Sequence, residues 1–65
     1  MKTLVVEVVD LHVRLTFGQI LMHSEDYSTV GNARRAGKSL AAAIVGRPVV
    51  LRYELRGKPV VERVR

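Results

Sequence analysis

The sequence predicts a small α+β domain, in which an antiparallel sheet carries one helix packed on a face. Two observations predict this class. Apolar and polar residues alternate at both ends of the chain, as in strands, and apolar residues recur at helical spacing between them. The expected order is β(β)αββ, with one strand or two at the start. Sixty-five residues are enough for a single domain, residues 1–65.

The first alternating stretch runs from Thr3 to Phe17. One parity is apolar apart from Glu7, and it contains Val5, Val9, Leu11, Val13, Leu15 and Phe17. A hairpin turning near residues 10–12 would divide the stretch into two strands, but no glycine, proline or asparagine marks a turn there. Both alternatives therefore stay open. We interpret residues 19–23 as further strand and the polar residues 24–29 as a loop.

The beginning of this stretch is apolar on both parities, since Leu4, Val6 and Val8 interleave with Val5 and Val9. A strand of this kind is typical of the centre of a sheet or of a subunit interface. One helix and a short sheet would not cover both sides, and an uncovered apolar patch marks an interaction site. We therefore expect a homodimer.

Residues 32–45 are predicted to be helical. Their helically spaced apolar residues are Ala33, Ala36, Leu40, Ala43 and Ile44. Asn32 or Thr29 is the expected N-cap, and Gly46 followed by Pro48 is a stop signal. Because most of this stripe is alanine, we expect the helix to lie close against the sheet.

The C-terminal part predicts a β-hairpin. Residues 49–55 alternate, residues 56–58 supply the turn around Gly57, and residues 60–64 return. Pro59 has no amide hydrogen to donate, so it belongs at a strand start or on an edge strand.

Several functional classes are excluded by composition and spacing. The chain has no cysteine, which excludes a disulfide-stapled secreted scaffold, and it has no run of apolar residues long enough to span a membrane, so we expect a cytoplasmic protein. Residues 31–39 end in Gly-Lys-Ser, but the first glycine of a phosphate-binding loop would have to stand at Asn32. With only two histidines, His12 and His23, we expect no metal, no cofactor and no catalytic residues.

Charge is the feature that points to a partner. Eleven lysines and arginines face six acidic residues, giving a net charge of +5, and eight of the eleven are arginine. Arginine binds phosphate in a bidentate manner, so a polyanion is the expected partner. The expected contact residues are Arg34, Arg35 and Lys38 on the helix, and Arg52, Arg56, Lys58, Arg63 and Arg65 on the hairpin.

The sequence therefore favours a non-enzymatic nucleic-acid-binding protein, chromatin-like or regulatory. Phe17 and Tyr53 fall on apolar parities, so no basic face carries aromatic residues on which single-stranded bases could stack. Duplex DNA bound through its phosphates is thus favoured over single strands. The alternative is a protein-interaction module, such as a small regulator, inhibitor or antitoxin. It would use an edge strand and its arginines against an acidic protein partner.

Overall fold

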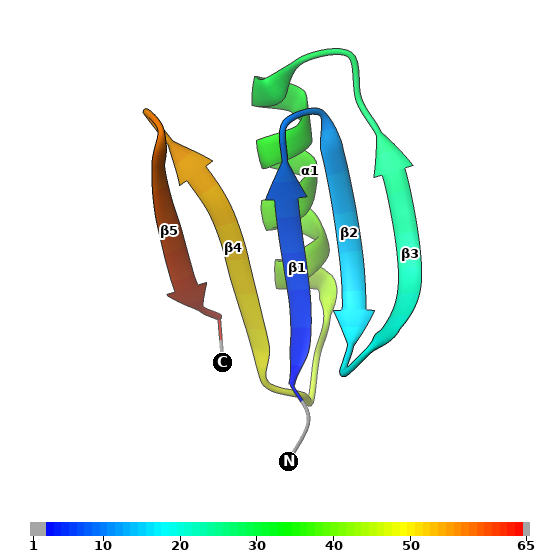
Figure 1. The fold of residues 1–65 in the computed structure, drawn as a ribbon. Coiled ribbons are helices and arrows are strands. Elements are labelled where there is room, and N and C mark those ends of the chain that lie inside the picture. Colours follow the sequence, from blue (N-terminus) through cyan, green and yellow to red (C-terminus); the bar gives the residue numbers. More distant parts are fainter. Residues whose placement is uncertain (1–2, 65) are drawn as a thin grey trace.

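The computed structural model describes residues 3–64, in which five strands form one sheet and a helix lies across one of its faces (Figure 1). This arrangement confirms the α+β class. The elements are β1 (Leu4–Val9), β2 (His12–Phe17), β3 (Ile20–Asp26), α1 (Val30–Ala43), β4 (Val49–Leu55) and β5 (Lys58–Arg63).

The sheet is mixed, which corrects the expectation of a wholly antiparallel sheet. Its strand order is β3-β2-β1-β4-β5, and β1 pairs with β4 in parallel, from Leu4 beside Val49 to Glu7 beside Arg52. The reason is the odd number of strands before the helix. After three strands the chain stands at the end of the sheet where β1 ends, and α1 carries it back to the end where β1 starts. β4 therefore runs in the same direction as β1.

The N-terminal half forms three strands, joined by two short turns. The first turn lies at Asp10 and Leu11, where Asp10 adopts a φ of 52°. Aspartate is among the few residues that tolerate this left-handed conformation, so a turn forms there without glycine. The interpretation of residues 19–23 as strand is confirmed. The expected loop over residues 24–29 is wrong for residues 24–26, because β3 is an edge strand and its exposed end can be polar.

The helix begins earlier than the sequence pattern alone indicates. Thr29 is the N-cap, and its Oγ1 accepts a hydrogen bond from the backbone amide of Asn32 at 3.1 Å. Of the two expected N-caps, Thr29 is therefore the one used. The last helical residue is Ala43, and Gly46, with a φ of 81°, lies in the connection to β4.

The hairpin of β4 and β5 is confirmed. Its two-residue turn consists of Arg56 and Gly57, whose φ angles are 54° and 77°. Positive φ at both central positions matches the twist of antiparallel strands, and glycine adopts it without strain. Pro59 lies on β5, which is an edge strand, as its missing amide hydrogen requires.

The core lies between α1 and the three central strands. Its buried apolar residues are Leu4, Val6, Val8, Val13, Ala33, Ala41, Val49, Leu51 and Tyr53. α1 packs mainly on β1, β2 and β4. Within residues 3–64, no helix is long and apolar enough to cross a membrane.

The doubly apolar strand β1 is central, as expected. Its Leu4, Val6 and Val8 are buried beneath α1, whereas Val5 and Val9 lie on the other side of the sheet. We call that other side, opposite α1, the open face. The side of β1 that faces α1 is therefore buried in the core. The apolar pattern of β1 alone does not require a second subunit.

Candidate nucleic-acid interface

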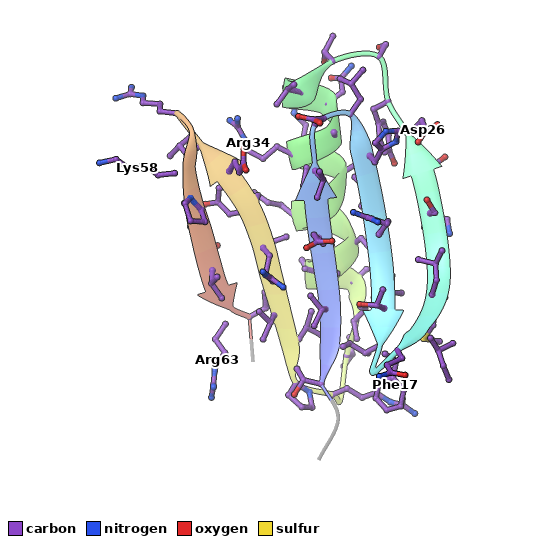
Figure 2. All side chains as sticks on the ribbon, in the orientation of Figure 1. Phe17, Asp26, Arg34, Lys58 and Arg63 are labelled. Atoms are coloured by element: carbon purple, nitrogen blue, oxygen red, sulfur yellow. The ribbon has the colours of Figure 1, made fainter. Side chains whose placement is uncertain are left out.

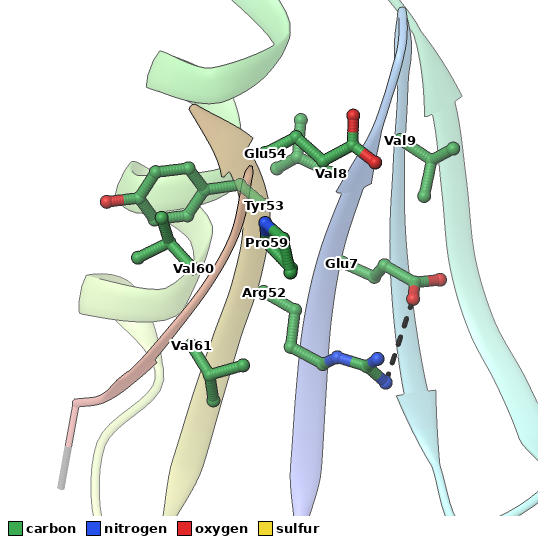
Figure 3. Close-up of a pocket in the computed structure, with 9 residues that line it drawn as sticks. All are labelled: Glu7, Val8, Val9, Arg52, Tyr53, Glu54, Pro59, Val60 and Val61. Atoms are coloured by element: carbon green, nitrogen blue, oxygen red, sulfur yellow. Dashed lines mark ion pairs between the residues drawn. The ribbon is translucent and has the colours of Figure 1, made fainter. Parts of the chain in front are cut away.

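The open face carries balanced charge. Strand alternation and register place on it three arginines, Arg14, Arg52 and Arg63, and three carboxylates, Glu7, Asp26 and Glu54. Glu7 lies between two of the arginines, with its carboxylate 3.3 Å from Arg14 Nη2 and 3.8 Å from Arg52 Nη1. Figure 3 shows the Glu7–Arg52 pair beside a shallow pocket of about 120 Å³. The arginines of the open face therefore do not form a strongly positive surface.

The helix side of the sheet carries the unbalanced positive charge. Five cations gather there on the flank of α1 nearer to β4 and on the end of the β4–β5 hairpin. They are Arg34, Arg35 and Lys38 of α1, Arg56 of the turn and Lys58 of β5, and we call this set the basic surface. Within residues 3–64, no ion pair of 4 Å or less involves any of them.

Two side-chain relationships bring α1 and the hairpin together. Arg34 and Arg56 line the same cavity of about 230 Å³, and Arg34, Arg35 and Lys38 together line a shallow depression on α1. Lys38 Nζ lies 5.3 Å from the centroid of the Tyr53 ring, close enough for a cation–π interaction. The side chains of Arg34 and Lys38 therefore lie on the flank of α1 that is nearer to β4.

Lys58 joins the basic surface through the register of the hairpin. It pairs with Leu55, which has the same parity as the buried Tyr53, so Lys58 stands on the helix side of β5. Arg63 pairs with Val50 and stands on the open face. Figure 2 shows Arg34 and Lys58 near one end of the hairpin and Arg63 toward its other end.

Tyr53 connects the basic surface to β5. Its hydroxyl donates a hydrogen bond of 2.7 Å to Glu62 Oε1. This bond raises the pKa of Tyr53, as do burial and the negative charge of Glu62, while the positive charge of Arg34 acts in the opposite direction. Glu62 is thus engaged by a neutral donor, and it is the one carboxylate that strand register places on the helix side of β5.

The cavity shared by Arg34 and Arg56 also contains acidic groups. It lies where β1 and β4 separate beyond the Glu7–Arg52 pair, close to the start of α1. Its lining consists of Val8, Asp10, Val30, Arg34, Glu54, Arg56 and Gly57. Two arginines and two carboxylates balance inside it, so the cavity is not itself an anion site. The positive charge becomes unbalanced outside it, toward Arg35, Lys38 and Lys58.

The structure brings together five of the eight contact residues expected from sequence, Arg34, Arg35, Lys38, Arg56 and Lys58. Arg52 and Arg63 lie on the open face and not on the basic surface, which corrects the expectation of a single basic hairpin face. Because Arg56 lies in the turn with positive φ, it no longer follows the parity of Arg52. Arg65 lies outside the described residues.

Sequence reasoning missed Tyr53 and Glu62 as parts of this surface. The signal that could have found them is the two-residue turn, because it fixes the hairpin register and pairs Tyr53 with Val60 and Leu51 with Glu62. Tyr53 and Glu62 are then diagonal neighbours on one side of the hairpin, within reach of a long side chain.

The histidines lie on β2 and β3, away from the basic surface. His12 Nδ1 pairs with Asp26, and His23 Nε2 lies 3.6 Å from Glu25 Oε2. All four side chains are at least half exposed. Among residues 3–64, no group of three or more histidine, cysteine or acidic side chains is placed to hold a metal ion.

Comparison of the chain with protein-family models, with curated proteins and with solved structures found no match. The functional argument therefore depends on the chain's own surface.

Proposed function

We propose that this protein is a non-enzymatic nucleic-acid-binding protein, chromatin-like or regulatory, that holds duplex DNA by its phosphates through the basic surface. The observation that carries the proposal is the segregation of charge. Arg14 and Arg52 of the open face share the carboxylate of Glu7, whereas no ion pair within residues 3–64 engages the five cations of the basic surface.

Unpaired cations on one surface favour a polyanionic ligand. Arg34 and Lys38 are one helical turn apart and repel each other in the free protein. A phosphate backbone relieves that repulsion and releases its own counterions on binding, which supplies most of the affinity of sequence-independent contacts. Arginine adds bidentate hydrogen bonds to phosphate oxygens.

The burial of the aromatic residues favours a duplex over a single strand. Tyr53 is 8% exposed, and Phe17 and Tyr27 are half-buried, so none of them offers a free ring. Proteins that bind single strands without sequence preference stack bases on exposed aromatic rings. The basic surface therefore suits a ligand whose bases stay stacked on each other.

A fluorescence-anisotropy titration tests this proposal. Labelled duplex DNA, duplex RNA and single strands are compared at two salt concentrations. We expect the tightest binding to duplex DNA, with an affinity that falls steeply as salt increases. If all five cations contact phosphates, log K falls against log salt with a slope of about −4.5. No binding to any nucleic acid at low salt, by protein shown to be folded, would contradict the proposal.

A matched pair of variants on β5 locates the binding surface. Lys58→Glu and Arg63→Glu reverse one exposed charge on the same strand, the first on the helix side and the second on the open face. We expect Lys58→Glu to weaken duplex binding and reduce the salt slope by about one or two, and Arg63→Glu to have a much smaller effect. Equal losses in both variants would show that charge alone, and not this surface, determines binding.

A second candidate function is a protein-interaction module that uses an edge strand, with an acidic protein as partner. The observation that favours it is that every residue of β3 is exposed. An added strand can pair with such an edge. The two functions are separated by the same titration, since a module of this kind would show no preference among nucleic acids and no localised loss in Lys58→Glu.

A further inference from the structure

Edge strand β3 exposes three consecutive large apolar side chains. Ile20, Leu21 and Met22 are 62%, 55% and 58% exposed. The main sheet contacts of α1 are with β1, β2 and β4, so the helix leaves most of β3 uncovered. Single apolar residues are common on protein surfaces, but a contiguous apolar patch marks an interaction site.

This patch continues onto the flank of α1 that faces away from the basic surface. Arg34 and Lys38 lie on the flank nearer to β4, so helical geometry turns Ala36, Leu40 and Ile44 toward β2. Leu40 and Ile44 are half-buried, as is Phe17 on the neighbouring strand. Leu21 pairs with Thr16 and therefore lies on the open face. We call the set Phe17, Ile20, Met22, Leu40 and Ile44 the apolar surface. His23 and Glu25 border it on the same side of β3.

Charge distribution favours a second copy of the chain as the group that covers this surface. Two copies with a net charge of +5 each repel one another wherever their basic surfaces approach. The apolar surface lies across α1 from the basic surface. Contact through it therefore holds the two sets of cations apart.

The size of the chain favours the same partner. Nine buried apolar residues form the core of residues 3–64, and a core this small leaves a short chain marginally stable unless association buries more apolar area. A standard dimer interface takes about 800 Å² from each partner. That is roughly a sixth of the 4729 Å² that the chain exposes.

The edges of the sheet restrict how the copies can meet. Pro59 on β5 lacks an amide hydrogen and disfavours strand addition at that edge. On β3, the register with β2 shifts between Leu15 and Thr16, so Met22 is an extra residue and only His23 to Asp26 offer a regular edge to an added strand. A contact made by side chains through one surface is therefore favoured over a continuous sheet, and a surface that meets itself closes a two-fold dimer.

We propose that the protein is a two-fold homodimer whose interface is the apolar surface of β3 and the adjoining flank of α1. The two basic surfaces then lie on the outer sides of the dimer. This inference does not depend on the nature of the ligand, and its test requires no nucleic acid.

Sedimentation equilibrium over a concentration series tests the dimer. We expect the wild-type chain to approach twice its 7.3 kDa mass as concentration rises. Met22→Glu places two carboxylates in one two-fold interface and is expected to raise the dissociation constant at least tenfold. Val61→Glu is the matched control, since Val61 is 64% exposed on the opposite edge strand. It makes the same charge change and is expected to leave the dimer intact.

Each other outcome overturns the proposal. A wild-type chain that stays at 7.3 kDa at the highest attainable concentration has no such dimer. A dimer that resists Met22→Glu, or is lost equally in Val61→Glu, uses another surface. Circular dichroism establishes that each variant is folded, and Ile20→Glu, at a position that is 62% exposed, replaces Met22→Glu if that variant does not fold.

Discussion

Gly37 of α1 lies so close to Val8 of β1 that a Cβ atom at position 37 would overlap the Cγ2 atom of Val8. Val8 cannot move aside easily, because its β-branched side chain is buried and stiff. Gly37→Ala would therefore push the helix away from the sheet. We expect a net loss of about 1–2 kcal/mol in the free energy of unfolding, since the overlap outweighs the better helix propensity of alanine. Urea denaturation measures it.

Gly31→Ala is the matched control for this prediction. Gly31 is also in α1, and a Cβ atom there would meet nothing within 4 Å. The same substitution is thus expected to stabilise the protein by up to about 1 kcal/mol. If both variants stabilise the protein, helix propensity and not the close approach to Val8 controls the effect.

Local sequence patterns predict most of this fold. The run of small residues in α1 predicts a helix close to the sheet, and the turn at Gly57 fixes the β4–β5 hairpin. The parallel pairing of β1 with β4 has no local signal, because it depends on how many strands precede α1. The turn at Asp10 was only one of two open alternatives, because aspartate marks a turn less strongly than glycine.

The candidate site was also only partly predictable, because local patterns group some of its residues and the pairing of strands decides the others. Helical spacing groups Arg34 with Lys38 from sequence alone. Strand parity groups Arg52 with Arg56 only if the strand continues, and it ends at Leu55. Pairing between strands, such as that of Glu7 with Arg14 and Arg52, decides which arginines are neutralised, and this requires the register of the whole sheet.

The N-cap of α1 provides a prediction about stability. Thr29→Ala removes the hydroxyl that accepts a hydrogen bond from the Asn32 amide, which leaves that amide without its cap. We expect a loss of about 1 kcal/mol in the free energy of unfolding. The neighbouring Ser28→Ala changes an exposed hydroxyl outside the cap and should have little effect. Comparable losses in both variants would contradict a capping role for Thr29.

The hydrogen bond between Tyr53 and Glu62 makes stability depend on pH at the alkaline end. It raises the pKa of Tyr53 above its unfolded value near 10, because only the protonated hydroxyl can donate to Glu62. The bond therefore stabilises the fold below about pH 10, and this contribution is lost as the pH rises through the folded-state pKa.

Ultraviolet absorbance of tyrosinate measures this pKa directly. In a Tyr27→Phe background, Tyr53 is the only tyrosine left. We expect Glu62→Gln to lower the Tyr53 pKa, since the glutamine keeps an acceptor oxygen but removes the negative charge. An unchanged titration curve would show that Glu62 does not control the ionisation of Tyr53.

Substitution of Glu7 tests the idea that pairing, rather than the number of arginines, keeps nucleic acid off the open face. Glu7→Gln removes the carboxylate between Arg14 and Arg52 and gives the open face an excess of positive charge. The cost in stability is expected to be below about 1 kcal/mol, because these pairs are partly exposed. Duplex binding should strengthen, and the salt slope should steepen by about one or two, as Arg14 and Arg52 become available to phosphates. In this background, Lys58→Glu should then cause a smaller loss of duplex affinity than it causes in the wild-type chain. If Glu7→Gln leaves both affinity and slope unchanged, ion pairing on the open face does not limit its contact with the ligand.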